Sequence, residues 1–320
     1  MSREMPKIAD RSQLLTEQRL AESMNLDRLS IEQGLAVMNE QDAVAVAAVA
    51  EQRGAVARAV QWVSEALNSG GRLIYVGAGT SGRLGVLDAA ECPPTFGTEP
   101  HVVQAIIAGG EAAMFRSQEG AEDRAEDGEK AVEQKKVGHG DVVLGIAAGG
   151  TTPFVRGAIQ RAKSLGARTI FLCCVAASAQ EPAADLVIRP LTGPEVLSGS
   201  TRLKAGSATK LVLNQITTLA MVRLGKVYEN LMVDLRATNQ KLWDRGARIV
   251  ATMAGLSRDE AMRLLRSADG EVKTAIVMQR RGIDAGIARE VLRAAAGDLR
   301  AAMRKTGRQG DKETRRQHRR

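Results

Sequence analysis

The sequence predicts an α/β protein in which a doubly wound parallel sheet lies between N-terminal helices and a small C-terminal helical module. Three observations support this prediction. Five short apolar runs alternate with helical stretches in the middle of the chain. The runs are apolar throughout, which is typical of parallel strands that are covered on both faces. Glycine-rich turns follow two of them, as they do where a strand leads into a helix of a doubly wound sheet.

The chain up to residue 70 is predicted to be helical. Asp27–Ser30 leads into an amphipathic stretch that ends at Met38, and Asp42–Leu67 is rich in alanine and valine at helical spacing. Ser69–Gly71 ends this stretch. We expect residues 1–70 to form a helical segment that packs on the core.

The strands are expected within residues 71–248, which form an α/β domain. They are assigned to the apolar runs Arg72–Val76, Val102–Ile107, Asp141–Ala147, Thr169–Val175 and Leu186–Ile188. Helices separate the strands, and they include Phe154–Leu165. A long helix, Thr201–Leu224, follows the last strand.

The chain changes character after about Val250, where two halves repeat at an offset of 27 residues. Ala261–Gly270 matches Ala288–Gly297, and within the repeat Leu265 matches Leu292. Outside these segments, Ala275 matches Ala302 at the same offset. We expect a small helical bundle over residues 249–303 that serves packing or dimer support. Residues 304–320 are expected to be a disordered basic tail.

Composition excludes several classes of protein. Aromatic residues make up 2 % of the 320 residues, and much of the net charge of +8 lies in the tail, so no nucleic-acid partner is expected. No apolar run approaches the roughly 20 residues of a membrane helix, and the N-terminus has no apolar signal core. We expect a cytoplasmic enzyme without a membrane partner.

The cysteines and histidines show no metal-ligand spacing, so no metal site is expected. Cys173 and Cys174 lie in an apolar run and are expected to be buried in a strand, while Cys92 is placed in a loop. Three unpaired cysteines fit a reducing compartment.

Three hydroxyl-rich turns, Gly77–Gly85, Ala147–Pro153 and Gly193–Lys204, precede helices. Backbone amides in such turns, together with a helix N-terminus, favour a phosphate, and Thr80 and Ser81 add hydroxyl donors. Each turn alone could be an ordinary helix cap. Three on one sheet predict a phosphorylated ligand at the carboxyl ends of the strands.

The first turn also has the glycine spacing of a dinucleotide-binding loop, at Gly77, Gly79 and Gly82. A ribose-binding acid is missing after the second strand, where Ala108–Gly110 stands instead. A nicotinamide dehydrogenase is therefore disfavoured.

Two glutamates are candidates for acid–base chemistry. Glu91 is expected to close a helix that begins at Gly82, because Pro93 and Pro94 follow it. A carboxylate at a helix C-terminus favours its protonated form, which suits a general acid, although a glutamate there is more often a surface residue. Glu122 lies in an acid-rich stretch that would ordinarily be a solvated turn.

In combination, these segments closely resemble the N-acetylmuramic acid 6-phosphate etherases of the sugar isomerase (SIS) fold, from about residue 11 to residue 303. The run Arg72–Gly97 is the longest and most specific of the matching stretches. The others are Thr16–Arg19, Glu119–Asp123, Gly145–Val155, Gly193–Gly206 and Lys210–Thr218.

The resemblance implies a reaction and a site. The lactyl group on C3 of the sugar is eliminated and water adds, giving N-acetylglucosamine 6-phosphate and D-lactate without a metal or nucleotide cofactor. The family's acid maps onto Glu91 and its second active-site glutamate onto Glu122. The resemblance and the turns together give the candidate substrate-binding residues Gly79, Thr80, Ser81, Gly150, Thr151, Glu195, Ser198, Ser200, Thr201 and Lys204. A homodimer is expected, because this fold usually places its sites near a dimer interface.

The sequence departs from the family pattern at two places. Gly149 stands where the family often has a serine, which removes one expected phosphate hydroxyl. Leu20-Ala21 replaces the Asn-Pro that often follows the motif at Thr16–Arg19. Two other functions remain open on the same fold: a sugar-phosphate isomerase and a non-catalytic sugar-phosphate regulator. The presence of both glutamates argues against the regulator.

Overall fold

The structure is a computed structural model that describes residues 14–179 and 181–304. The chain forms two compact units. Among the described residues, the first comprises 14–93 and 98–220 without 180, and the second comprises 94–97 and 221–304. The expected tail lies outside the described residues from position 305 onward. The expected boundary at residue 248 falls inside helix α8, Gln240–Ala254.

The first unit is built on a five-stranded sheet in which every neighbouring pair is parallel. The strand order is β2-β1-β3-β4-β5, so the order reverses between β1 and β3. The strands are β1 Leu73–Gly77, β2 Val103–Ile107, β3 Val142–Ile146, β4 Arg168–Leu172 and β5 Leu186–Ile188. The predicted parallel sheet is confirmed, and its reversal point is where open sheets of this kind bind ligands.

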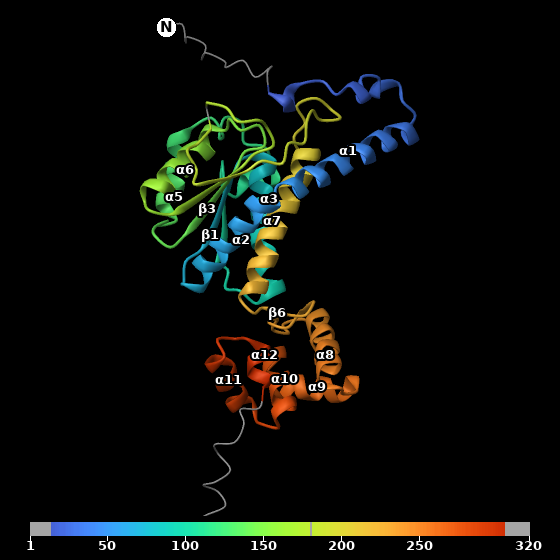
Figure 1. Cartoon of the computed structure of the whole chain (residues 1–320), viewed down its shortest axis with the longest axis vertical. Helices are drawn as coiled ribbons and strands as arrows, with labels where there is room; N and C mark the ends of the chain where they lie inside the picture. The colour runs from blue at the N-terminus through green and yellow to red at the C-terminus, as the bar shows by residue number, and fades with distance from the viewer. Residues whose placement is uncertain (1–13, 180, 305–320) are drawn as a thin grey trace, which may run out of the picture. The chain divides into compact units, whose positions relative to one another are not determined.

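Helices cover both faces of this sheet, as expected of a doubly wound fold (Figure 1). Helices α5 Ala125–Gln134 and α6 Pro153–Ser164 lie on one face, where Val155 and Ile159 pack with strand residues such as Phe171. Helices α2, α3 and α7 lie on the other face, and their bounds are Arg53–Asn68, Gly79–Phe96 and Lys204–Arg223.

The N-terminal part of the described chain contains three short 3-10 turns, Leu15–Glu17, Ala21–Ser23 and Leu26–Arg28, followed by α1, Ile31–Glu51. Ser30 and Gln33 form a capping box that starts α1. The single helix expected over residues 42–67 is divided at Gln52, which has φ −89° and ψ 11°. The Gln52 side chain accepts a hydrogen bond of 2.9 Å from the Arg189 backbone, which ties this break to the end of β5.

Helix α3 corrects the expectation about Glu91. The helix begins at Gly79 and continues through Pro93 and Pro94 to Phe96, so it does not end at Glu91. A proline ring fixes φ close to the helical value, and both prolines lie in the last turn of the helix, where they give up their own hydrogen bonds to the preceding turn. Glu91 therefore lies before the last turn, where the helix dipole has little effect.

The cysteines differ slightly from their expected positions. Cys92 belongs to α3 instead of a loop, and Cys173 and Cys174 follow β4 instead of lying within it. All three side chains are buried and unpaired.

The second unit confirms the internal repeat. After an antiparallel pair, β6 Val227–Tyr228 and β7 Leu231–Met232, comes α8. Helices α9 Arg258–Ser267 and α10 Val272–Arg281 are followed by α11 Ala285–Ala294 and α12 Leu299–Met303, which each begin 27 residues later. The linking glycines, Gly270 and Gly297, have φ of 78° and 80°. Leu265, Leu292, Ala275 and Ala302 are all buried in one core.

None of the helices in residues 14–179 and 181–304 combines the length and the apolar character needed to span a bilayer.

Candidate active site at the carboxyl ends of the strands

Hydrogen bonds and close contacts bring the three predicted turns together at the carboxyl ends of β1, β3 and β4. The Cys174 backbone, just after β4, donates to Ala148 O at 2.9 Å, and its Sγ lies 3.8 Å from Ala205 O in α7. The first and third turns also meet at Gly206, where a Cβ would lie 3.7 Å from Thr80 Cγ2 and 3.4 Å from Thr201 O, both ordinary contact distances. Three helices, α3, α6 and α7, thus begin close to one location, where their amides favour an anion.

The N-terminal motif at Thr16–Arg19 lies against two of these turns. Gly199 N donates to Thr16 O at 3.0 Å, and Ser198 Oγ donates to the carbonyl oxygens of Glu17 and Gln18 at 3.0 and 3.2 Å. Thr16 is fully buried. Its Oγ1 has no partner among the described residues, and a Cβ built on Gly149 would lie 3.9 Å from it. The Thr16 hydroxyl therefore lies next to position 149, where the family often has a serine.

Most of the predicted hydroxyls in the turns are half-buried and have no side-chain partner in the part of the chain that the structure describes. Ser198, by contrast, is exposed and bonded to the N-terminal motif. The free hydroxyls are those of Thr80, Ser81, Thr151, Ser200 and Thr201. Thr152 precedes α6 but makes no side-chain cap bond. These hydroxyls are consequently not used up as helix caps, and they are available to a ligand.

Glu195 and Lys204 are buried and bonded within the protein. The Glu195 carboxylate accepts from the backbone nitrogens of Lys204 and Ala205 at 2.9 and 3.0 Å, which starts α7 three residues later than expected. The Lys204 ammonium donates to Gln41 Oε1 at 2.5 Å. Burial lowers the pKa of Lys204, and the nearby Glu195 carboxylate partly opposes this effect. The pair ties the third turn to α1 and α7.

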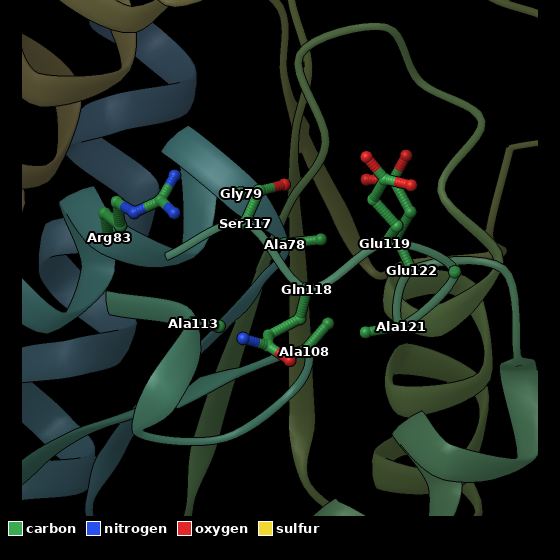
Figure 2. A pocket seen from close by; sticks show the side chains of 11 residues that line it. Ala78, Gly79, Arg83, Ala108, Ala113, Ser117, Gln118, Glu119, Ala121 and Glu122 are labelled. Atoms are coloured by element: carbon green, nitrogen blue, oxygen red, sulfur yellow. The ribbon is translucent and has the colours of Figure 1, made fainter. Parts of the chain in front are cut away.

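A pocket of about 210 Å³ adjoins the start of α3 and contains one of the two candidate glutamates (Figure 2). Gly79 and Glu122 both line it, as do Glu119 and Arg83. The Glu122 segment is held against α6, because Glu122 O accepts a 3.0 Å hydrogen bond from Phe154 N in the first turn of that helix. Glu122 is thereby placed next to the helix that follows the second turn.

Glu91 is not part of this pocket. It is exposed on α3, twelve residues beyond Gly79, which corresponds to about 18 Å along a helix at 1.5 Å per residue. The two candidate glutamates are therefore brought to different places within one chain.

No group of three or more His, Cys, Asp or Glu side chains in residues 14–179 and 181–304 is arranged to hold a metal ion.

Sequence reasoning missed three residues of this region. Arg83 and Glu119 lie inside the matching stretches, but single positions in those stretches gave no signal of a shared pocket. Asp88 is a buried carboxylate that accepts from Tyr75 Oη and Asn214 Nδ2, both at 2.7 Å, and from Thr217 Oγ1 at 3.2 Å. An aspartate followed by two alanines in a helix gives no sign of burial.

Comparisons with known proteins identify the family. Curated N-acetylmuramic acid 6-phosphate etherases from Picosynechococcus sp. and Trichormus variabilis are each 52 % identical to this chain. The matches cover 94 % and 96 % of the chain and 100 % of each relative. The chain belongs to the N-acetylmuramic acid 6-phosphate etherase family. Within this etherase, residues 55–163 match the glucokinase regulatory protein N-terminal SIS domain, and residues 229–296 match the C-terminal lid domain of glucokinase regulatory protein.

Solved structures with a similar fold include a phosphoheptose isomerase from Francisella tularensis and another from Neisseria gonorrhoeae. The first is 17 % identical, with a TM-score of 0.43, over 59 % of this chain and 98 % of that one. The second is 14 % identical, with a TM-score of 0.42, over 61 % of this chain and 98 % of that one.

Proposed function

We propose that this chain is a carbon–oxygen lyase that cleaves the C3 D-lactyl ether of N-acetylmuramic acid 6-phosphate in cell-wall sugar recycling. The products are N-acetylglucosamine 6-phosphate and D-lactate. Family membership supports the reaction, because the identity of 52 % extends over nearly the whole chain. The observation that carries the site is the convergence of three helix starts and five free hydroxyls around one place, which suits the 6-phosphate.

Two carboxyl groups can perform the reaction by elimination followed by addition. In the open-chain sugar, the C1 aldehyde acidifies the C2 proton. Glu122 removes this proton, the C3–O bond breaks, and Glu91 protonates the departing lactate oxygen. Water then adds to C3 of the unsaturated aldehyde and C2 is reprotonated. The net result is exchange of the lactyl ether for a hydroxyl group on C3.

The separation of the two glutamates supports a homodimer in which a second copy supplies Glu91. Since Glu91 lies eight residues beyond Arg83, or about 12 Å further along α3 than the last pocket residue of that helix, one chain does not bring both glutamates to one sugar. An exposed apolar face favours the same assembly. Ile31, Leu35 and Met38 are spaced along one side of α1, with exposures of 79, 54 and 39 %. Figure 1 shows this part of α1 extending away from the sheet.

Glu195 and Lys204 serve as positioning residues in this proposal. Both are buried and bonded to the protein, so they shape the third turn without reaching the sugar. The free cysteines support work in a reducing compartment such as the cytoplasm.

Isotope labelling tests the reaction. Incubation with N-acetylmuramic acid 6-phosphate should release lactate, and in heavy water the product sugar should carry deuterium at C2. In oxygen-18 water the label should appear on C3 of the sugar, because lactate keeps the ether oxygen. Oxygen-18 in lactate with no deuterium at C2 would contradict elimination. Binding or isomerisation of sugar phosphates without lactate release would favour a regulator or an isomerase instead.

A further inference from the structure

The pocket beside Glu122 has an uneven charge distribution. Its charged side chains are Arg83, Glu119 and Glu122, so Arg83 is the only cation among the described residues that line it. Figure 2 shows the Arg83 guanidinium at one side of the pocket and the two carboxyl groups at the other. An anionic group that enters this pocket is repelled by the glutamates and attracted to Arg83 alone.

Arg83 is held in place by a hydrogen bond, but no carboxylate pairs with it among the residues that the structure describes. Its Nε donates to Met114 O in α4, Ala112–Phe115, at 3.0 Å. Other half-buried arginines of this unit make ion pairs of 2.6 Å, Arg72 with Asp141 and Arg189 with Glu181. Arg83 has no ion pair within residues 14–179 and 181–304. The terminal guanidinium nitrogens therefore remain available to a planar anion, which an arginine binds through two parallel hydrogen bonds.

We propose that Arg83 binds the carboxylate of the substrate's lactyl group and so determines specificity for the lactyl ether; this inference rests on the proposed function. If Glu122 acts at C2, then C3 and its ether substituent lie in the same pocket. The lactyl carboxylate is one carbon from the ether oxygen, so it must sit close to Glu119 and Glu122 unless a cation holds it elsewhere. Arg83, across the pocket, supplies that cation.

The 6-phosphate is assigned to a different set of groups. The free hydroxyls and the helix starts belong to the three turns, and the phosphate is three carbons away from C3 along the sugar chain. The product sugar phosphate has lost the lactyl group and makes no use of Arg83. Binding of the carboxylate by Arg83 therefore raises the affinity for the substrate relative to the product sugar phosphate.

The experiment compares two substrates and three enzymes: the wild type, Arg83→Met and Arg83→Lys. One substrate is the natural lactyl ether 6-phosphate, and the other is its lactamide, in which a neutral amide replaces the carboxylate. The wild type should prefer the natural substrate by about 10²-fold in kcat/KM, as expected for a hydrogen-bonded ion pair. Arg83→Met should lose about 10²-fold on the natural substrate and little on the lactamide, so the preference should nearly vanish. Arg83→Lys keeps the positive charge but cannot make two parallel hydrogen bonds to a carboxylate, so it should retain part of the preference.

Two controls isolate the interaction. Arg116→Met removes an exposed cation next to Ser117, a pocket residue, but Arg116 itself does not line the pocket. This variant should keep the preference of the wild type. Inhibition by N-acetylglucosamine 6-phosphate should be unchanged in Arg83→Met, which also shows that the phosphate site is intact.

Several results would overturn the assignment. Equal losses on both substrates would mean that Arg83 only positions the Met114 segment. An unchanged preference for the natural substrate would show that another group binds the carboxylate. Weaker inhibition of Arg83→Met than of the wild type by N-acetylglucosamine 6-phosphate would place the phosphate at Arg83. If the wild type cleaves neither ether, releasing neither lactate nor lactamide, the proposed function fails, which is a separate outcome.

Discussion

The Thr16 hydroxyl is buried beside Gly149 and has no partner among the described residues. Leaving a buried hydroxyl unpaired costs about 1–3 kcal/mol. The Gly149 backbone is not in the left-handed region, and a Cβ at this position would meet only Thr16 Oγ1, at 3.9 Å. A serine side chain at position 149 therefore has room, and its hydroxyl comes within hydrogen-bonding reach of Thr16.

Gly149→Ser should raise the free energy of unfolding by about 1 kcal/mol, because it supplies the missing partner. Denaturant unfolding, with an unchanged m-value, measures this gain. Thr16→Val provides the matched background, since valine has the same shape without the hydroxyl. Gly149→Ser should give no gain there. An equal gain in both backgrounds would show that the serine stabilises by another route.

The three cysteines share an environment that suppresses their reactivity. Burial raises the pKa of Cys92 to about 12 and that of Cys173 to about 11, and it also raises the pKa of Cys174. A thiol reacts as its thiolate, so iodoacetamide at pH 8 should leave the folded protein unmodified over the time in which a free thiol is consumed. Mass spectrometry should show three additions in denaturant. Rapid modification of any cysteine in the native protein would contradict this burial.

At the scale of elements, Asp88 joins a strand and two helices. The carboxylate on α3 accepts from Tyr75 of β1 and from Asn214 and Thr217 of α7. Burial and the Asp88 charge raise the pKa of Tyr75 well above its usual value, so the phenol stays protonated as a donor. This network fixes α3, and with it the start of the helix at the proposed phosphate site and the Arg83 side chain.

Asp88→Ala should destabilise the first unit by about 3 kcal/mol, because buried donors lose their acceptor and a cavity is left. Asp88→Asn should cost less, since the amide oxygen still accepts. Asp127→Ala is the matched control. Among the described residues, Asp127 forms only a 4.0 Å surface pair with Arg124, and its loss should change the unfolding free energy by less than about 0.5 kcal/mol. Thermal and denaturant unfolding measure all three. Similar stabilities of Asp88→Ala and Asp127→Ala would rule out Asp88 as a structural hub.

The repeat in the second unit shows how local sequence specifies an element. Ser257 and Asp284, 27 residues apart, both cap their helices by accepting a backbone N–H. Gly270 and Gly297 occupy the same left-handed conformation at the following turns. Each half therefore carries its own start and stop signals, which is why the repeat can be recognised from the sequence alone.

At the scale of the whole molecule, the proposed dimer makes a prediction about two inactive variants. Glu91→Gln and Glu122→Gln should each lower kcat by about 10²-fold or more through loss of acid–base catalysis. If a second copy supplies Glu91, a mixed dimer of the two variants contains one intact site. Random mixing should then restore about a quarter of the wild-type activity, because half of the dimers are mixed and each has one working site.

The mixing experiment needs subunit exchange, which co-expression of two differently tagged variants provides. Wild type mixed with either variant under the same conditions serves as the control for exchange. Activity that stays at the level of the separate variants, in dimers shown to be mixed, would place both glutamates in one chain or remove one from the reaction.

The sequence alone determined the order and type of the elements in the core. The strands could be predicted because parallel strands buried on both faces are continuously apolar, and each observed strand lies within about one to three residues of its expected bounds. The hydroxyl-rich turns could be located because glycines and hydroxyls follow the strands directly. The resemblance to the family supplied the reaction and the active-site roles of the two glutamates, which the spacing of residues did not imply.

Only the tertiary structure decided which of these residues meet. Helix α3 continues through two prolines because their ring geometry is compatible with a helix, so the expected end at Glu91 was wrong. Helix α7 starts where the Glu195 carboxylate, nine residues earlier in the chain, accepts from the Lys204 backbone. Arg83 faces Glu122 only because α3 and the segment after β2 fold against each other. Local signals specify an element through its own backbone, whereas a site depends on side chains from several elements, whose distances no single segment encodes.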